Sequence, residues 1–151
     1  MIRSEAPTGE ASRALFGEYM ALVRERLGDA FNPSEDIFAT EAAFDGPGTA
    51  WLVLYKDGVP VACGGLRPLG AGVAEIKRMF VTAAARGRGH GRALLAELER
   101  RARDAGYDRV RLYTTEVLHE ARALYADAGY HRIEMPNVDD RAEDIWLEKR
   151  L

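Results

Sequence analysis

The most unusual residues in the chain form one short stretch, RGRGHGR, which runs from Arg86 to Arg92. The stretch directly precedes an amphipathic segment that is expected to form a helix. The first N–H groups of a helix have no partner within it, and the helix dipole adds partial positive charge there. Glycine lets a ligand approach the backbone, and arginine forms charge-assisted hydrogen bonds with phosphate. These residue types therefore predict a site for a phosphate-bearing ligand.

Two common nucleotide-binding patterns do not fit this stretch. A P-loop would end in Gly-Lys-Ser or Gly-Lys-Thr, whereas this sequence has Gly91-Arg92-Ala93. A dinucleotide fingerprint would read G-x-G-x-x-G directly after a strand. Here the spacing is G-x-G-x-G, and residues 82–85 separate it from the preceding apolar run. The spacing therefore argues against a P-loop enzyme and against a nucleotide-dependent oxidoreductase.

The elements that hold this loop can be predicted from the spacing of apolar residues. Apolar residues recur every three or four positions in segments that predict helices over 12–27, 34–44, 89–105 and 119–129. Alternating or continuous apolar runs predict strands over 51–56, 59–66, 73–81, 109–114, 130–133 and 144–148. Asp57-Gly58 predicts a hairpin, and Pro68 to Gly72 predict a turn. The order indicates a mixed sheet with helices on its faces, and residues 1–151 are expected to form a single domain.

The bulk composition is typical of a globular protein, with 47% apolar and 30% charged residues. No apolar run approaches the ~18 residues of a membrane span, and the N-terminus lacks the apolar segment of a secretory signal. The single cysteine, Cys63, fits a reducing compartment, and the three histidines are too scattered for a metal site. We therefore expect a cytoplasmic protein with no membrane partner and no metal.

Charge is distributed unevenly along the chain. The net charge of −3 argues against a general nucleic-acid binder. Residues 75–111 contain 10 basic and 5 acidic side chains, whereas residues 1–50 contain 4 and 9. The distribution fits an anionic ligand bound by the middle of the chain and a cationic ligand approached by the ends.

One pattern does fit the glycine-rich stretch. Arg86 to Gly91 have the form R-x-x-G-x-G, they follow a strand that ends at Val81, and an A-x-x-L-Y-x-x-x-G pattern runs from Ala121 to Gly129. Together these features resemble the acyl-CoA-binding signature of the GNAT N-acetyltransferase superfamily. The resemblance covers the element order of most of the chain and is densest from Val59 to Gly129. It implies an α/β (α+β) fold with a mixed, mainly antiparallel sheet of six to seven strands and about four helices. The sheet would splay between the strands ending at Val81 and Thr114.

The resemblance also implies acetyl-CoA as co-substrate and suggests how it is held. Backbone groups of the strand that ends at Val81 would bond the pantetheine arm, and one N–H group would polarise the thioester carbonyl. Backbone N–H groups from Gly87 to Arg92 would hold the pyrophosphate, with the loop arginines near the phosphates. The implied cofactor-binding residues are Met79, Phe80, Val81, Arg86, Gly87, Arg88, Gly89, His90, Gly91, Arg92 and Tyr125.

Two residues acquire catalytic roles by the same resemblance. Tyr125 would lie beside the sulfur of CoA and protonate the departing thiolate. Glu75 matches the glutamate that serves some family members as general base, whereas other members use ordered water. Leu118 stands where many members place an asparagine that bonds the pantetheine arm, and the adjacent His119 is a candidate substitute.

The implied reaction transfers an acetyl group directly from acetyl-CoA to a primary amine of a small molecule or peptide, in a ternary complex. Acidic residues in the segments expected on the acceptor side favour a cationic amine. They are Glu35, Asp36, Glu41, Asp139, Asp140, Glu143 and Asp144, with Tyr19, Phe38 and Phe44 among them. The alternative is a catalytically idle acyl-CoA-binding module that regulates a partner. A homodimer is compatible with the sequence, but no signal specifies one.

Overall fold

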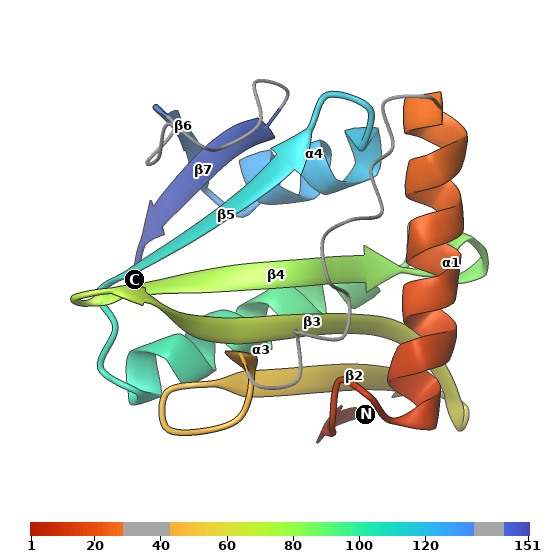
Figure 1. The fold of residues 1–151 in the computed structure, drawn as a ribbon, viewed down its shortest axis with the longest axis horizontal. Coiled ribbons are helices and arrows are strands. Elements are labelled where there is room, and N and C mark those ends of the chain that lie inside the picture. Colours follow the sequence, from red (N-terminus) through yellow and green to blue (C-terminus); the bar gives the residue numbers. More distant parts are fainter. Residues whose placement is uncertain (29–42, 135–143) are drawn as a thin grey trace.

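The computed structural model describes residues 1–28, 43–134 and 144–151, and its centre is a seven-stranded sheet. Its strands lie in the order β1-β2-β3-β4-β5-β7-β6 (Figure 1). The strands are β1 (Ile2–Ser4), β2 (Ala50–Lys56), β3 (Val59–Gly70), β4 (Val73–Val81), β5 (Arg109–Thr115), β6 (His131–Ile133) and β7 (Asp144–Arg150). The described helices are α1 (Glu10–Leu27), α3 (His90–Asp104), α4 (His119–Asp127) and the short 3-10 helix η2 (Ala83–Ala85).

This architecture confirms the predicted mixed, mainly antiparallel sheet. The Asp57-Gly58 hairpin forms with positive φ at both residues, the geometry that matches the strand twist. The predicted turn over 68–72 is shorter than expected, because Pro68 pairs with Ala74 and β3 runs on to Gly70. Strand β1 was not predicted. The helix predicted over 34–44 falls almost entirely outside the described residues.

Two apolar cores lie on opposite faces of the sheet, under α1 and under α3 (Figure 1). On one face, α3 contributes Leu94, Leu95 and Leu98, which are almost fully buried against the sheet. On the other face, α1 contributes Leu15, which packs in a cluster with Trp51. Burial on both faces fixes the central strands in position. Among the described residues, no helix is long and apolar enough to cross a membrane.

The sheet opens between β4 and β5, as predicted. Their parallel pairing is limited to Val73–Glu75 of β4 and Arg109–Arg111 of β5. Beyond this point the two strands diverge (Figure 1), although β4 continues to Val81 and β5 to Thr115. The rest of β4 therefore has one edge that is not paired with β5, and backbone groups along this edge can bond groups other than a neighbouring strand.

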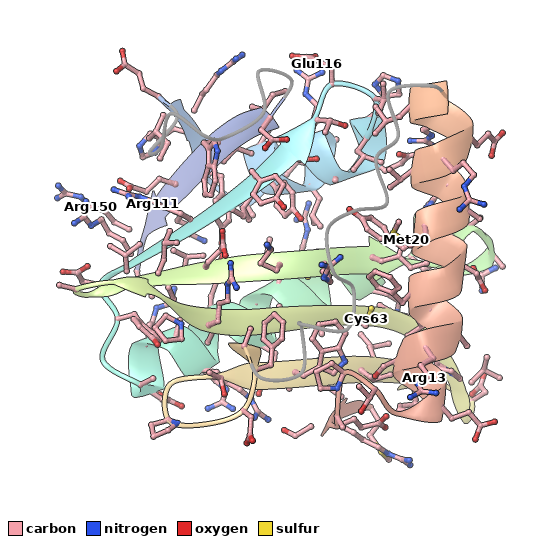
Figure 2. The ribbon with its side chains drawn as sticks, viewed as in Figure 1. Arg13, Met20, Cys63, Arg111, Glu116 and Arg150 are labelled. Carbon is pink, nitrogen blue, oxygen red and sulfur yellow. The ribbon has the colours of Figure 1, made fainter. Side chains whose placement is uncertain are left out.

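Strand β4 is also interrupted by a bulge. The register with β3 shifts between Cys63 and Gly65, so that Arg78 and Met79 together lie opposite Gly64. Arg78 has a φ of 58°, in the left-handed region. The Cys63 thiol donates a hydrogen bond to the Arg78 carbonyl at 3.7 Å, and burial raises the pKa of that thiol to about 12. Figure 2 shows Cys63 beside α1. The thiol is therefore a structural donor, and the bulge re-aims the side chains that follow it.

Gly65 should be required for packing, whereas Gly17 should not. A Cβ at Gly65 would clash with Phe44 and lie 2.8 Å from Trp51 Cε3, but a Cβ at Gly17 on α1 would meet nothing within 4 Å. We expect Gly65→Ala to lower the free energy of unfolding by about 1–3 kcal/mol, because the core is overpacked. The control Gly17→Ala should raise it by about 0.5–1 kcal/mol, since alanine favours the helix. Urea unfolding measures both changes, and equal stability of Gly65→Ala and the wild type would contradict the packing.

Candidate active site

A pocket of about 290 Å³ lies where the free part of β4 meets the start of α3, with α1 and α4 beside it. It is open to solvent and is lined by both apolar and charged side chains. The lining residues are Tyr19, Leu22, Met79, Phe80, Val81, Ala85, Arg86, Gly87, Gly89, His90, Gly91, Arg92, Leu118, Glu120, Ala121, Leu124, Tyr125 and Asp127. All the predicted cofactor-binding residues except Arg88 are therefore brought to one place. Arg88 is exposed in the glycine loop and is not part of the lining.

The glycine loop reaches the pocket through backbone conformations that favour glycine. Gly87 has a φ of 75° and Gly89 a φ of 83°, and Gly89 is the N-cap of α3. A Cβ at either position would meet nothing within 4 Å. These glycines are thus explained by their positive φ and by the access that they give a ligand to the backbone, and not by tight packing. The first turn of α3, from His90 to Arg92, directs its free N–H groups toward this end of the helix.

Arg86 is held by the protein at the edge of the pocket. Its Nε donates a hydrogen bond to the Val81 carbonyl at 3.2 Å, and its guanidinium lies 5.9 Å from the centre of the Phe80 ring. A terminal nitrogen reaches Glu120 at 3.5 Å. Arg86 therefore fixes the end of β4 relative to α4, besides adding positive charge to the pocket.

Glu120 joins this group to α1. It accepts hydrogen bonds at 2.7 Å from both terminal nitrogens of Arg26, and Arg26 also donates to the Val117 carbonyl at 3.0 Å. The bonds from Arg26 lower the pKa of the Glu120 carboxyl to about 2. The pair spans 94 residues, so no local sequence signal could have revealed it. Arg26, Glu120 and Arg86 together connect α1, α4 and the glycine loop around the pocket.

Tyr125 lies in α4 with only 5% of its surface exposed, and it lines the pocket. Burial raises the pKa of its hydroxyl above the ordinary value, and the nearby Tyr19 raises it further. The phenol is therefore protonated at neutral pH and can donate a hydrogen bond. Its ring packs against Tyr130 at 5.7 Å, while Tyr19 approaches from α1 and packs against Phe80 at 5.6 Å.

Glu75 is not brought to this pocket. Its side chain is 2% exposed, and it accepts a hydrogen bond at 2.7 Å from Arg67 on β3. It also belongs to the short segment of β4 that pairs with β5, opposite Arg111. Glu75 is therefore not among the residues that line the pocket with Tyr125, and its carboxylate is paired with Arg67 within the sheet. Its role as general base stays a prediction.

Other predicted residues have mixed positions. Leu118 lines the pocket as the N-cap of α4, whereas His119 is exposed and is not part of the lining. Phe44, expected on the acceptor side, is instead buried against Trp51. Of the acidic residues expected there, Asp144 begins β7, and the others lie outside the described residues, as does Phe38. No group of three potential metal ligands occurs within residues 1–28, 43–134 and 144–151.

Comparison with known proteins identifies the family. The acetyltransferase (GNAT) family matches residues 16–130. The chain belongs to this family. The match extends from α1, across the free part of β4 and the glycine loop, to Tyr130, which follows the C-terminal end of α4 and packs on Tyr125.

Two relatives agree in sequence with this GNAT assignment. The IAA acetyltransferase of Azospirillum brasilense is 32% identical over 130 residues, which cover 85% of this chain and 82% of that protein. The uncharacterized N-acetyltransferase YjgM of Escherichia coli K12 is 35% identical over 91 residues. That alignment covers 58% of this chain but only 54% of YjgM, so the chain spans about half the length of this relative.

Solved structures agree on the fold. A candidate acyl-CoA N-acyltransferase from Klebsiella pneumoniae superposes with a TM-score of 0.77 and 28% identity, covering 100% of this chain and 97% of that one. The PaiA N-acetyltransferase of Thermoplasma acidophilum, solved in complex with coenzyme A, superposes with a TM-score of 0.73, covering 100% and 98% of the two chains. Its identity is 16%, so it supports the fold alone.

The ion pair between Arg26 and Glu120 should make stability depend on pH in a defined window. The folded pKa of Glu120, about 2, lies below its usual 4.5. The ionised carboxylate therefore stabilises the fold above pH 4.5, and this contribution is lost as the pH falls toward 2. We expect the difference in urea midpoint between wild type and Glu120→Gln to be constant above pH 5 and to shrink between pH 4.5 and pH 3.

The matched control is Glu18→Gln on the exposed side of α1, where no ion pair is formed among the described residues. Its midpoint should differ from the wild type by the same amount at every pH. A Glu120→Gln difference that also stays constant down to pH 3 would contradict the role of the pair.

Proposed function

We propose that this protein is an acetyl-CoA-dependent N-acetyltransferase that acts on a primary amine of a small molecule or peptide by direct transfer in a ternary complex. The observation that carries the proposal is the meeting of three features in one pocket: the free edge of β4, the glycine loop at the start of α3, and the hydroxyl of Tyr125. A nucleotide site would need the loop, but it would need neither the opened strand nor the buried phenol.

The residues around the pocket fit the cofactor that the family implies. The loop from Gly87 to Arg92 would receive the pyrophosphate, because its glycines leave the backbone accessible and the α3 dipole favours an anion. The free edge of β4 at Met79 and Val81 would form backbone hydrogen bonds with the pantetheine arm, as the edge of a sheet does with an added strand. The acetyl group would then lie beside Tyr125.

The raised pKa of the Tyr125 hydroxyl determines how this group can assist departure of the thiolate. A thiolate has a pKa of about 8.5 by analogy with cysteine, well below that of a phenol, so complete proton transfer from Tyr125 is uphill. Its hydroxyl would instead donate a hydrogen bond to the sulfur as negative charge develops there and keep its own proton. The proton that the amine nitrogen loses would pass to solvent, and the released thiolate would take its proton from solvent. A β4 amide would stabilise the carbonyl oxygen in the same step.

The amine must lose a proton before it can attack. Glu75 is the base expected from the sequence, but its pairing with Arg67 and its absence from the pocket lining do not favour that role. Ordered water is the alternative that the geometry leaves open. The same observation is the only structural support for an idle acyl-CoA-binding module, whereas the placement of Tyr125 in the pocket argues against one.

Acetyl-CoA-dependent thiol release should be accelerated by an acceptor in a panel of polyamines, aminoglycosides, amino acids and short peptides. With that acceptor, Tyr125→Phe should lower kcat by roughly 10- to 150-fold, the equivalent of one hydrogen bond to a charged group. The Kd of acetyl-CoA, measured by calorimetry, should stay unchanged. The matched control is Tyr130→Phe, since Tyr130 is also buried but its hydroxyl contacts Glu99 outside the pocket. A Tyr125→Phe enzyme that turns over like the wild type at every pH would disprove the role.

Cofactor binding should depend on Gly89 and not on Gly106, although both adopt positive φ at the ends of α3. Their φ values are 83° and 90°, and a Cβ at either would meet nothing within 4 Å. Substitution by alanine should therefore lower the free energy of unfolding by a similar amount at each site, about 1–2 kcal/mol. Only Gly89→Ala should weaken acetyl-CoA binding, by roughly tenfold or more, because the loop N–H groups lose their alignment. Equal calorimetric Kd values for the two variants would argue against the pyrophosphate site.

A further inference from the structure

Arg78 stands out among the arginines of the chain for its backbone. Among the described residues, only Asp57 and Arg78 have positive φ without being glycine. Asp57 lies in a two-residue hairpin turn, where this conformation is expected. Arg78 lies in the bulge of β4, immediately before Met79, which lines the pocket. Backbone strain of this kind costs free energy and is concentrated at functional sites.

The side chain of Arg78 is only partly satisfied. Its guanidinium carbon lies 4.9 Å from the centre of the Phe16 ring on α1, so the side chain extends over the face of the sheet that α1 covers. Its Nε is shielded from solvent and has no hydrogen-bond partner. In the described part of the chain, no carboxylate lies within ion-pair distance of it. A buried donor of a charged group without an acceptor is costly, so the position of Arg78 needs an explanation other than a structural ion pair.

The surrounding charges do not offset Arg78. On the same side of the sheet, Glu75 is already paired with Arg67 at 2.7 Å. On the neighbouring β5 and β7, Glu148 is paired with Arg111 at 2.7 Å. Glu75 and Glu148 are thus both paired with other arginines and are not partners of Arg78.

The position of Arg78 distinguishes it from the arginines of the glycine loop. Arg86 and Arg92 line the pocket beyond the end of β4, at the start of α3. Arg78 lies on the other side of Met79, Phe80 and Val81, beneath α1. If the loop receives the phosphates and β4 the pantetheine arm, Arg78 lies past the reactive end of the cofactor. The anion that it is built to bind would then belong to the acceptor.

We propose that Arg78 binds a carboxylate of the acceptor, so that the amine substrate is an amino acid or a closely similar amino acid derivative. This inference rests on the proposed acetyltransferase function. Guanidinium recognises a carboxylate through two parallel hydrogen bonds, and a bulge can hold it at the orientation this requires. The amino group of the same molecule would meet the acetyl group at Met79–Val81. A polyamine or an aminoglycoside offers no anion for Arg78, and is disfavoured.

The test compares α-amino acids with their amides, which keep the amine and lose the carboxylate. Wild-type thiol release should show a higher kcat/KM for a free amino acid than for its amide. Arg78→Asn should lower kcat/KM for the amino acid by roughly tenfold or more and leave the amide unaffected. Asparagine is chosen because it tolerates the left-handed conformation. Arg78→Lys should restore part of the activity. The control is Arg13→Gln, which removes an exposed charge on α1 (Figure 2) and should change neither substrate.

Three outcomes would overturn the inference. Equal losses for the amino acid and the amide would mean that Arg78 is structural. A weaker calorimetric Kd for acetyl-CoA in Arg78→Asn, absent when 3′-dephospho-CoA is the probe, would assign Arg78 to a cofactor phosphate. Equal wild-type kcat/KM values for the amino acid and the amide would mean that the enzyme does not recognise the carboxylate of its acceptor.

A separate measurement distinguishes this failure from failure of the proposed function. Calorimetric binding of an N-acetyl amino acid, compared with its amide, needs no turnover. If the wild type binds the N-acetyl amino acid more tightly than its amide, and Arg78→Asn abolishes this difference, the inference is supported. It is supported even if no amine accelerates thiol release, and in that case only the acetyltransferase proposal fails. Absence of that preference in the wild type counts against Arg78.

Discussion

The short pairing between β4 and β5 is the constraint on which the rest of the structure depends. Only Val73–Glu75 of β4 pair with β5, so the backbone beyond them has an edge without a strand partner. Unpaired backbone groups are costly unless they bond something else. The protein compensates for part of this cost, because Arg86 donates to the Val81 carbonyl. The two cores keep β4 in place, since Phe80 packs toward α1 while Ala74 and Ile76 pack toward α3.

Charged side chains help to connect the elements around the opening. Glu120 accepts two hydrogen bonds from Arg26 and lies 3.5 Å from Arg86, which connects α1, α4 and the glycine loop. Pairs that are this exposed, with 46% of the Glu120 side chain accessible, contribute little to stability individually. Their value lies in position, because they set the relative placement of three elements that approach the pocket from different parts of the chain.

Local patterns in the sequence were sufficient to predict the mixed sheet and the glycine loop of the candidate site. The Asp57-Gly58 turn, the apolar periods and the glycine loop all depend on residues close in sequence. The sequence could not show that the extra residue falls on β4 at Arg78, since register depends on both strands. The sequence also could not reveal the ion pair between Arg26 and Glu120, or the pairing of Glu75 with Arg67.

The bulge divides β4 into two parts with different electrostatic surroundings. Before it, Glu75 lies in the paired segment and its charge is balanced by Arg67 across the ladder. At the bulge, Arg78 leaves the regular alternation and has no carboxylate partner among the described residues. Only two residues thus separate Glu75, which is paired with Arg67, from Arg78, which has no such partner. In the proposed function, the same strand is a scaffold on one side of the bulge and a ligand-binding edge on the other, which would account for a strained arginine conformation at the boundary.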